Sequence, residues 1–277
     1  MDVEQARRRF SVEVSRPEDD IDLAEVALLI AAEAQGGLDL PAERSRLAAL
    51  ATAAEPAVAR GRSEVERLAN LAHQLFGVDG LGGDDQDYYN PDNSYLNRVL
   101  DRRLGIPITL SIILIDIGRR LGLPLLGVSF PSHFLVTHEE HTDVLVDPFH
   151  RGRLLVESDC KDMLESMSDG RLSYRRAFTQ PAPPREIVAR LLNNLKSIHI
   201  RRRDVDSAIS VVDRLLLLAP GEAREHRDRG LLHLSQDRFR RALADLEVYL
   251  AEAPDATDRL VIEARAAEAH AKLKSQN

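Results

Sequence analysis

The chain of 277 residues is long enough for about two domains, and its 44% of hydrophobic residues allows each to bury a core. Its 45 acidic residues outnumber 37 basic ones, and a net charge of −8 disfavours general binding to nucleic acid or anionic membranes. A single cysteine, Cys160, excludes an internal disulfide and a multi-cysteine zinc site. No apolar run is long enough for a signal core or a membrane span, so we expect a cytoplasmic protein.

Residues 1–20 are charged and only weakly periodic, which predicts an N-terminal arm. Residues 21–90 predict a helical lobe and a loop that belong to the core domain. The first helix of this lobe has apolar residues at helical spacing and ends at Gly36. A second helix starts near Pro41, which suits a first helical position, and a third starts at Ser63 with a capping-box pattern. We assign no chemistry to these helices.

Two polar stretches suggest metal ligands, but neither has the spacing of a known site. Residues 77–92 hold five aspartates and four glycines, without the alternating oxygens and closing glutamate of a calcium loop. Residues 138–143 hold two histidines separated by two residues, with His150 nearby, and this is not the metalloprotease pattern. We interpret both stretches as solvated loops, and we predict no metal and no cofactor.

A long apolar segment, Pro107 to Leu121, is the centre of the predicted fold. Its isoleucines favour strands, but the segment is too long for a typical strand. Pro107 and Gly122 also mark it as a helix, because they suit its first residue and its C′ residue. Apolar side chains on nearly all sides predict a helix that is buried on most faces.

After this helix the apolar pattern alternates and predicts four short strands: Leu125–Phe130, Ser132–Thr137, Asp143–Pro148 and Arg153–Val156. If residues 138–142 form a hairpin loop, Thr137 pairs with Asp143, and His133 lies directly opposite Asp147 on the same face. An imidazole held by a carboxylate is the orienting pair of a catalytic triad. The alternative is that His133 and Asp147 have only a structural role and attach the hairpin to the helix.

Several motifs in this region resemble a known family. They are Asn93-Ser94-Tyr95-Leu96, Arg103 to Leu110, Leu121-Gly122-Leu123-Pro124, Gly127 to Val136, and Val146-Asp147-Pro148-Phe149. Together they resemble the transglutaminase-like core of the bacterial SirB-one type, whose members carry tetratricopeptide-type repeats at the C-terminus. The resemblance implies a papain-like α+β core over residues 91–180, with a central helix packed on an antiparallel sheet.

In active transglutaminase-like enzymes the catalytic cysteine begins the central helix two residues after a glycine, and the following strands supply a histidine and an aspartate. By this resemblance His133 and Asp147 match the histidine and the aspartate. The cysteine position is Pro107, which has neither a nucleophilic side chain nor an N–H group to donate to an oxyanion. The resemblance therefore implies that the usual thiol mechanism is absent.

Two hydroxyls and one thiol remain as alternative nucleophiles. Ser111 lies one helical turn, about 5.4 Å, deeper than Pro107, and Thr109 is rotated by about 200° from it. Bonds to local carbonyls or to the free N–H groups of the first turn explain both hydroxyls more simply. Cys160 falls in an expected helix over residues 158–167, where we interpret it as an unreactive free thiol.

Residues 185–277 follow a linker with three prolines and predict helices throughout. Ala219-Pro220 recurs after 34 residues as Ala253-Pro254, and Ala208 recurs in the same way as Ala242. This period resembles that of tetratricopeptide repeats. The predicted parts are two units and a closing helix: Ala189–Gly221, Ala223–Asp255 and Ala256–Lys274.

The sequence supports three hypotheses of function. In the first, the chain is a non-catalytic module that binds or scaffolds a peptide or protein partner. The predicted groove residues are Asn93, Tyr95, Pro107, Thr109 and His133. In the second, the chain is a hydrolase or acyl-transferase in which Ser111 or Thr109 acts with His133 and Asp147. In the third, the pair of His133 and Asp147 only stabilises the fold.

Overall fold

The computed structural model describes residues 1–275 and divides into two compact units, Met1–Leu191 and a second that begins at Leu192. The division falls inside helix α8 (Pro184–Arg201). The first unit combines helices with a four-stranded antiparallel sheet, and the second is helical. The predicted fold class, a mixed core followed by helical repeats, is therefore confirmed.

The longer helices of the first unit are α1 (Val3–Val14), α2 (Leu23–Gln35), α3 (Leu40–Val58), α4 (Glu64–Ala72), α5 (Leu96–Arg102), α6 (Pro107–Arg120) and α7 (Glu157–Ser168). Four short helical segments are η1 (Glu18–Asp20), η2 (His73–Val78), η3 (Pro91–Asn93) and η4 (Arg176–Thr179). The main sheet has the order β3 (Leu125–Val128), β4 (Leu135–His138), β5 (His141–Asp147) and β6 (Arg153–Leu155). A short parallel pair joins β1 (Gly82–Gly83) and β2 (Leu104–Gly105).

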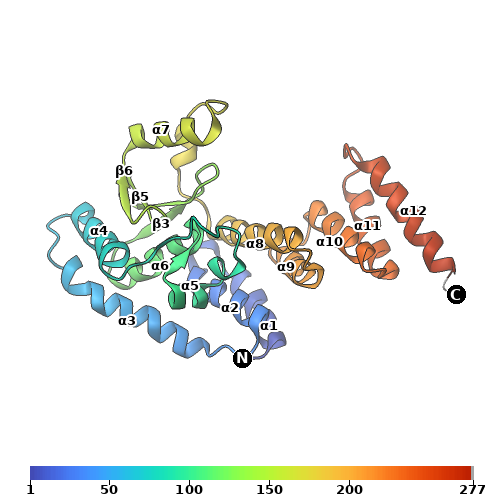
Figure 1. Ribbon diagram of the computed structural model, residues 1–277, viewed down its shortest axis with the longest axis horizontal. Helices are drawn as coiled ribbons and strands as arrows, with labels where there is room; N and C mark the ends of the chain where they lie inside the picture. Colours follow the sequence, from blue (N-terminus) through green and yellow to red (C-terminus); the bar gives the residue numbers. More distant parts are fainter. Residues whose placement is uncertain (276–277) are drawn as a thin grey trace. The chain divides into compact units, whose positions relative to one another are not determined.

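Helix α6 lies at the centre of the first unit, as the sequence predicted (Figure 1). Its residues from Pro107 to Ile115 are all buried, because helices α2 to α5 and strands β3 and β4 all contact α6. Proline suits the first position, where an N–H group would have no partner within the helix. The helix ends at Arg120. Two residues later Gly122 has a φ of 75°, and the N–H of Leu123 donates to the carbonyl of Gly118 at 2.9 Å.

The predicted N-terminal arm was wrong, because residues 3–14 form helix α1. Asp2 caps this helix by accepting a hydrogen bond from the N–H of Gln5 at 2.7 Å. Ala6 and Phe10, four residues apart, are fully buried, and α1 contacts α2. Two apolar side chains one turn apart are enough to dock a short helix, but they give only a weak periodic signal among charged neighbours.

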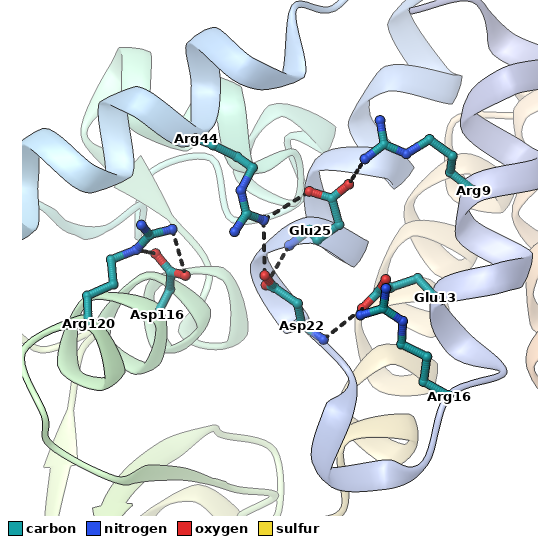
Figure 2. A network of polar contacts seen from close by, with 8 residues as sticks. All are labelled: Arg9, Glu13, Arg16, Asp22, Glu25, Arg44, Asp116 and Arg120. Atoms are coloured by element: carbon teal, nitrogen blue, oxygen red, sulfur yellow. Dashed lines mark hydrogen bonds and ion pairs between the residues drawn. The ribbon is translucent and has the colours of Figure 1, made fainter.

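Charged side chains join α1, α2 and α3, as Figure 2 shows. Arg9 of α1 and Arg44 of α3 donate to Glu25 of α2 at 2.5 and 2.9 Å, and Arg44 also binds Asp22 at 3.0 Å. Glu25 is only 7% exposed. The two guanidinium groups therefore compensate a carboxylate whose burial would otherwise be costly. The charged residues that weaken the apolar pattern of α1 in the sequence thus help to attach this helix to α2.

The hairpin of β4 and β5 has a tighter turn than the sequence predicted. His138 pairs with His141, and Thr137 pairs with Leu145 instead of Asp143. The predicted loop and register were wrong because an irregularity between Thr137 and His138 lets the ladder continue almost to the turn. The register differs by two residues, and a shift of two leaves each side chain on its predicted face.

The proline-rich segment is packed as part of the first unit. Pro181 forms a bridge with Val128 of β3, and the N–H of Ala182 donates to the carbonyl of Gly127 at 2.8 Å. Pro184 then begins α8. These residues extend the edge of the sheet, whereas the sequence predicted a linker between the domains.

The second unit contains the end of α8 followed by α9 (Val205–Leu218), α10 (Ala223–Ser235), α11 (Phe239–Glu252) and α12 (Arg259–Ser275). Ala208 and Ala242, one predicted period apart, are both fully buried. Gly230 allows α10 and α11 to approach closely, because an added Cβ would lie 2.7 Å from the Cδ2 atom of Leu246. The small residues of the repeat therefore lie where helices contact each other.

Candidate functional site

The structure brings together the three positions that the sequence compared with a catalytic triad. Pro107 begins α6, His133 ends the turn before β4, and Asp147 ends β5. The Nε2 atom of His133 lies 2.9 Å from the Oδ1 atom of Asp147. Both side chains are buried, with relative exposures of 4% and 1%.

The contact between His133 and Asp147 does not result from the predicted cross-strand pairing. His133 precedes β4 and lies in a turn that its N–H closes by donating to the carbonyl of Phe130 at 3.0 Å. The preceding residue, Ser132, has a φ of 56°, which few residues other than glycine adopt. The turn, rather than a position directly across the hairpin, brings the imidazole to Asp147.

Asp147 also binds a second histidine that the sequence analysis did not connect with it. Its Oδ2 atom lies 2.6 Å from Nδ1 of His150, and its Oδ1 atom accepts the N–H groups of Phe149 and His150 at 3.1 and 3.2 Å. Burial alone would raise the pKa of Asp147, but hydrogen bonds and charge from His133 and His150 outweigh it and hold this pKa below its usual value. The sequence could have indicated this contact, because an aspartate at the end of a strand commonly binds backbone groups of the turn that follows it.

A pocket of about 510 Å³ opens beside this group. Its lining residues are Asp85, Tyr88, Pro107, Ser132, His133, Phe149, His150, Met163, Ser166 and Met167. Phe149 has edge contacts with both His133 and Tyr88, with ring centroids 6.0 Å apart in each pair. Aromatic rings and thioethers thus surround the imidazole with mainly apolar surface.

Only two of the five predicted groove residues, Pro107 and His133, line this pocket. Asn93 and Thr109 are fully buried, and Tyr95 is 7% exposed. The side chain of Asn93 donates to the carbonyl of Asp87 at 2.8 Å, so it fixes the loop before α5. These three residues do not line this pocket, because their buried side chains belong to the motif that leads into α6.

Within residues 1–275, none of the alternative nucleophiles forms a hydrogen bond with the His133 ring. The hydroxyl of Thr109 donates to the carbonyl of Asn93 at 2.8 Å, and Ser111 is fully buried without a hydrogen-bond partner among residues 1–275. Cys160 is buried in an apolar cluster. Burial, with the nearby negative charges of aspartate and glutamate residues, raises the pKa of its thiol to about 11, so little thiolate forms near neutral pH.

Arg190 of α8 holds the turn that carries His133. Its guanidinium donates to Ser129 Oγ at 2.7 Å and to the carbonyls of Phe130 and His133 at 3.0 and 2.5 Å. It also lies over the ring of Phe134, 5.5 Å from the centroid. These contacts fix the backbone on both sides of the turn, so the sequence after the proline-rich segment contributes to the pocket.

The two loops that the sequence analysis interpreted as solvated form no metal-ligand cluster among residues 1–275. In the first, Asp84 is 5% exposed and binds Arg102 at 2.9 Å and the N–H of Asp87 at 3.0 Å. In the second, His138 is buried and accepts the N–H of Glu140 at 3.2 Å. Both loops therefore use these side chains to close their own turns.

No helix within residues 1–275 combines the length and the apolar character that crossing a bilayer requires. Residues 42–193 match a family model described as the transglutaminase-like superfamily, and residues 195–267 match a tetratricopeptide repeat model.

Relatives of this chain occur in several bacteria. A UPF0162 protein of Xylella fastidiosa is 42% identical over 200 residues, which cover 68% of this chain and 71% of that protein. A UPF0162 protein of Vibrio cholerae is 27% identical over 239 residues, covering 86% and 88% of the two chains. Protein SirB1 of Salmonella typhimurium is 29% identical over 222 residues, covering 79% and 82%.

Proposed function

Because the chain belongs to the transglutaminase-like superfamily and carries tetratricopeptide repeats, we propose that it is a non-catalytic member that binds a peptide or protein segment beside His133. The observation that carries this proposal is Pro107. The resemblance matches Pro107, two residues after Gly105, to the position of the catalytic cysteine, and Pro107 lines the same pocket as His133. The imidazole therefore faces a side chain that can neither attack a carbonyl nor stabilise an oxyanion.

The hydrogen bonds of His133 support the same proposal. Its Nε2 atom binds Asp147, and within residues 1–275 no hydroxyl or thiol hydrogen-bonds to its ring. A nucleophile activated by general-base catalysis needs such a contact, directly or through one water. With Nε2 occupied, Nδ1 remains as a polar contact for a bound ligand.

The pocket walls indicate what kind of side chain would bind. Tyr88, Phe149, Met163 and Met167 supply aromatic and thioether surface. Methionine side chains adapt to differently shaped apolar groups, and the volume lies within the usual range for ligand pockets. An aromatic or long aliphatic side chain of a peptide fits this chemistry, with His133 as its polar neighbour. The tetratricopeptide repeats, which generally mediate protein interactions, would offer a second surface.

Display of random peptides on the full chain tests binding at the pocket. We expect enrichment of peptides with a large apolar residue, and loss of this enrichment in Met167→Arg, which places a charge on the pocket wall. Leu172→Arg is the matched control, because Leu172 is similarly exposed, at 49% against 44%, and does not line the pocket. Equal enrichment in both variants, or none in the unchanged chain, contradicts the binding proposal.

An activity assay tests the proposal that the chain is not catalytic. Transfer of an amine to a glutamine-containing peptide, and hydrolysis of that peptide, should stay at background for the unchanged chain and for His133→Ala. Turnover that His133→Ala abolishes would overturn the proposal and favour an enzyme with another nucleophile.

A cysteine introduced at Pro107 tests the position itself. A thiol at a helix N-terminus beside a histidine has a lowered pKa, so Pro107→Cys should react with iodoacetamide about tenfold or more faster than a control cysteine at slightly acid pH. Ser166→Cys is that control, because Ser166 lines the pocket from α7. Adding His133→Ala should slow Pro107→Cys and leave Ser166→Cys unchanged. Equal rates would remove the main support for the proposal.

A further inference from the structure

The carboxylate of Asp147 lies between two imidazole rings that both line the pocket. One oxygen is 2.9 Å from Nε2 of His133, and the other is 2.6 Å from Nδ1 of His150. One ligand atom from each of these residues lies within 4.8 Å of the other two. The ring centroids are 5.5 Å apart. Three metal-binding side chains from two different turns therefore converge on one point.

The chemistry of this group favours a transition-metal ion. Two imidazole nitrogens and one carboxylate oxygen are the donor set of zinc sites that keep a fourth position open. Calcium and magnesium prefer oxygen ligands alone, so the two nitrogens argue against them. Asp147 is also a buried carboxylate, whose negative charge a bound cation would compensate.

Outer contacts already hold two of the three side chains in place. The Oδ1 atom of Asp147 accepts the N–H groups of Phe149 and His150, which leaves Oδ2 on the side of the His150 ring. Arg190 fixes the backbone of His133 by donating to its carbonyl. Bound metals depend on this kind of support, which orients the ligands before the ion arrives.

We propose that Nε2 of His133, a carboxylate oxygen of Asp147 and Nδ1 of His150 bind one Zn²⁺ ion or a similar divalent transition-metal ion, with the fourth position open to the pocket. Zinc–nitrogen bonds of about 2.0–2.1 Å place ligand atoms about 3.3 Å apart. The imidazole nitrogens, now 2.9 and 2.6 Å from the carboxylate oxygens, must therefore shift to make room for the ion. His150 supplies this movement, because its side chain is 61% exposed, whereas that of His133 is 4% exposed. The site goes beyond the proposed function and does not depend on peptide binding.

Titration of the chelator-treated full chain with ZnCl₂, followed by calorimetry and equilibrium dialysis, tests the site. We expect one saturable Zn²⁺ site per chain, and an affinity at least about 100-fold weaker in His150→Ala. His270→Ala should bind as the unchanged chain does, because His270 is similarly exposed, at 56%, and lies in α12. His150→Cys should regain binding, because a thiolate is also a zinc ligand.

Three results would overturn the inference. The first is the absence of saturable Zn²⁺ binding to the unchanged chain. The second is equal affinity in His150→Ala. The third is binding that survives in His150→Ala and disappears in His141→Ala, which would place the ion at the hairpin turn. Circular dichroism of each metal-free variant separates lost binding from lost folding, and recovery in His150→Cys separates a ligand from a merely structural side chain.

Discussion

The pocket of the first unit and the helix contacts of the second unit use charged groups in opposite ways. In the second unit, Arg229 of α10 donates to Asp213 of α9 at 2.8 Å and to both oxygens of Asp245 of α11 at 2.8 and 2.7 Å. His226 also binds Asp245 at 3.0 Å. Burial alone would raise the pKa of Asp245, but hydrogen bonds from Arg229 and His226 outweigh it, so this pKa is lowered.

At the pocket, the buried carboxylate of Asp147 also binds two partners, but one of them, His150, is largely exposed. Charges enclosed between helices mainly hold those helices together. A carboxylate whose partners line a pocket is in contact with whatever enters it. Burial of an ion pair therefore does not by itself indicate a functional site, whereas exposed partners make the carboxylate accessible to a ligand.

We expect the largest loss of stability from removing Arg229, which binds Asp213 and Asp245 between the helices of the second unit. Arg229→Met should lower the free energy of unfolding of the repeat unit by about 3 kcal/mol, because it leaves Asp245, which is 5% exposed, without its main cation. Hydrogen exchange of peptides from α9 to α11 measures this loss. Arg238→Met, which removes an exposed pair with Asp206, is the control and should cost less than about 1 kcal/mol.

The double variant Arg229→Met, Asp245→Leu sharpens the same test. It should recover most of the stability, since replacing both charges by apolar groups removes the uncompensated carboxylate. If the single variant costs less than about 1 kcal/mol, the enclosed network does not hold the helices together and the comparison fails.

An intermediate effect should follow from crowding the helix contact at Gly230. Gly230→Ala places a Cβ 2.7 Å from Leu246 Cδ2 and 3.2 Å from the carbonyl of Ala242, so we expect a loss of about 2 kcal/mol in thermal or denaturant unfolding. Gly221→Ala is the matched control in the same unit, because nothing lies within 4 Å of its Cβ position. Equal melting of both variants would mean that the repeat does not need this close approach.

The smallest effect is expected at the pocket. His150→Ala should lower the free energy of unfolding by less than about 1 kcal/mol, because Asp147 keeps its bonds to His133 and to two backbone N–H groups. Denaturant unfolding in metal-free buffer measures it. A cost near that of Arg229→Met would favour the hypothesis that the histidines and Asp147 only stabilise the fold.

Local patterns in the sequence were sufficient to predict most helices and strands. They were insufficient to predict the contacts between these elements. Pro107 and Gly122 marked both ends of α6, and alternating residues found the four strands. The hairpin register was wrong by two residues, yet His133 still contacts Asp147, because the turn before β4 carries the imidazole to the end of β5. The alternating pattern thus predicted the correct pair of residues, but it did not predict the turn that joins them.

The missed features depend on distant parts of the chain. Helix α1 is defined by Phe10 packing in the core, and no local pattern of the first residues contains that contact. Asn93 does not line the pocket, because its side chain donates to the carbonyl of Asp87 inside the protein, and a polar residue in a motif can have an interior role as well as a surface one. His150 was overlooked as a partner because the sequence analysis grouped it with the hairpin loop instead of with Asp147.

The position of Arg190 limits how the two parts could be separated or exchanged. A chain that stops at the prolines, or a fusion that joins other repeats at residue 185, would lose the guanidinium that holds the carbonyl of His133. The match to the superfamily model ends at residue 193, beyond Arg190. The segment that must be transferred to keep the pocket intact therefore includes the beginning of α8. A fusion point that preserves the pocket lies after Leu191 rather than at the prolines.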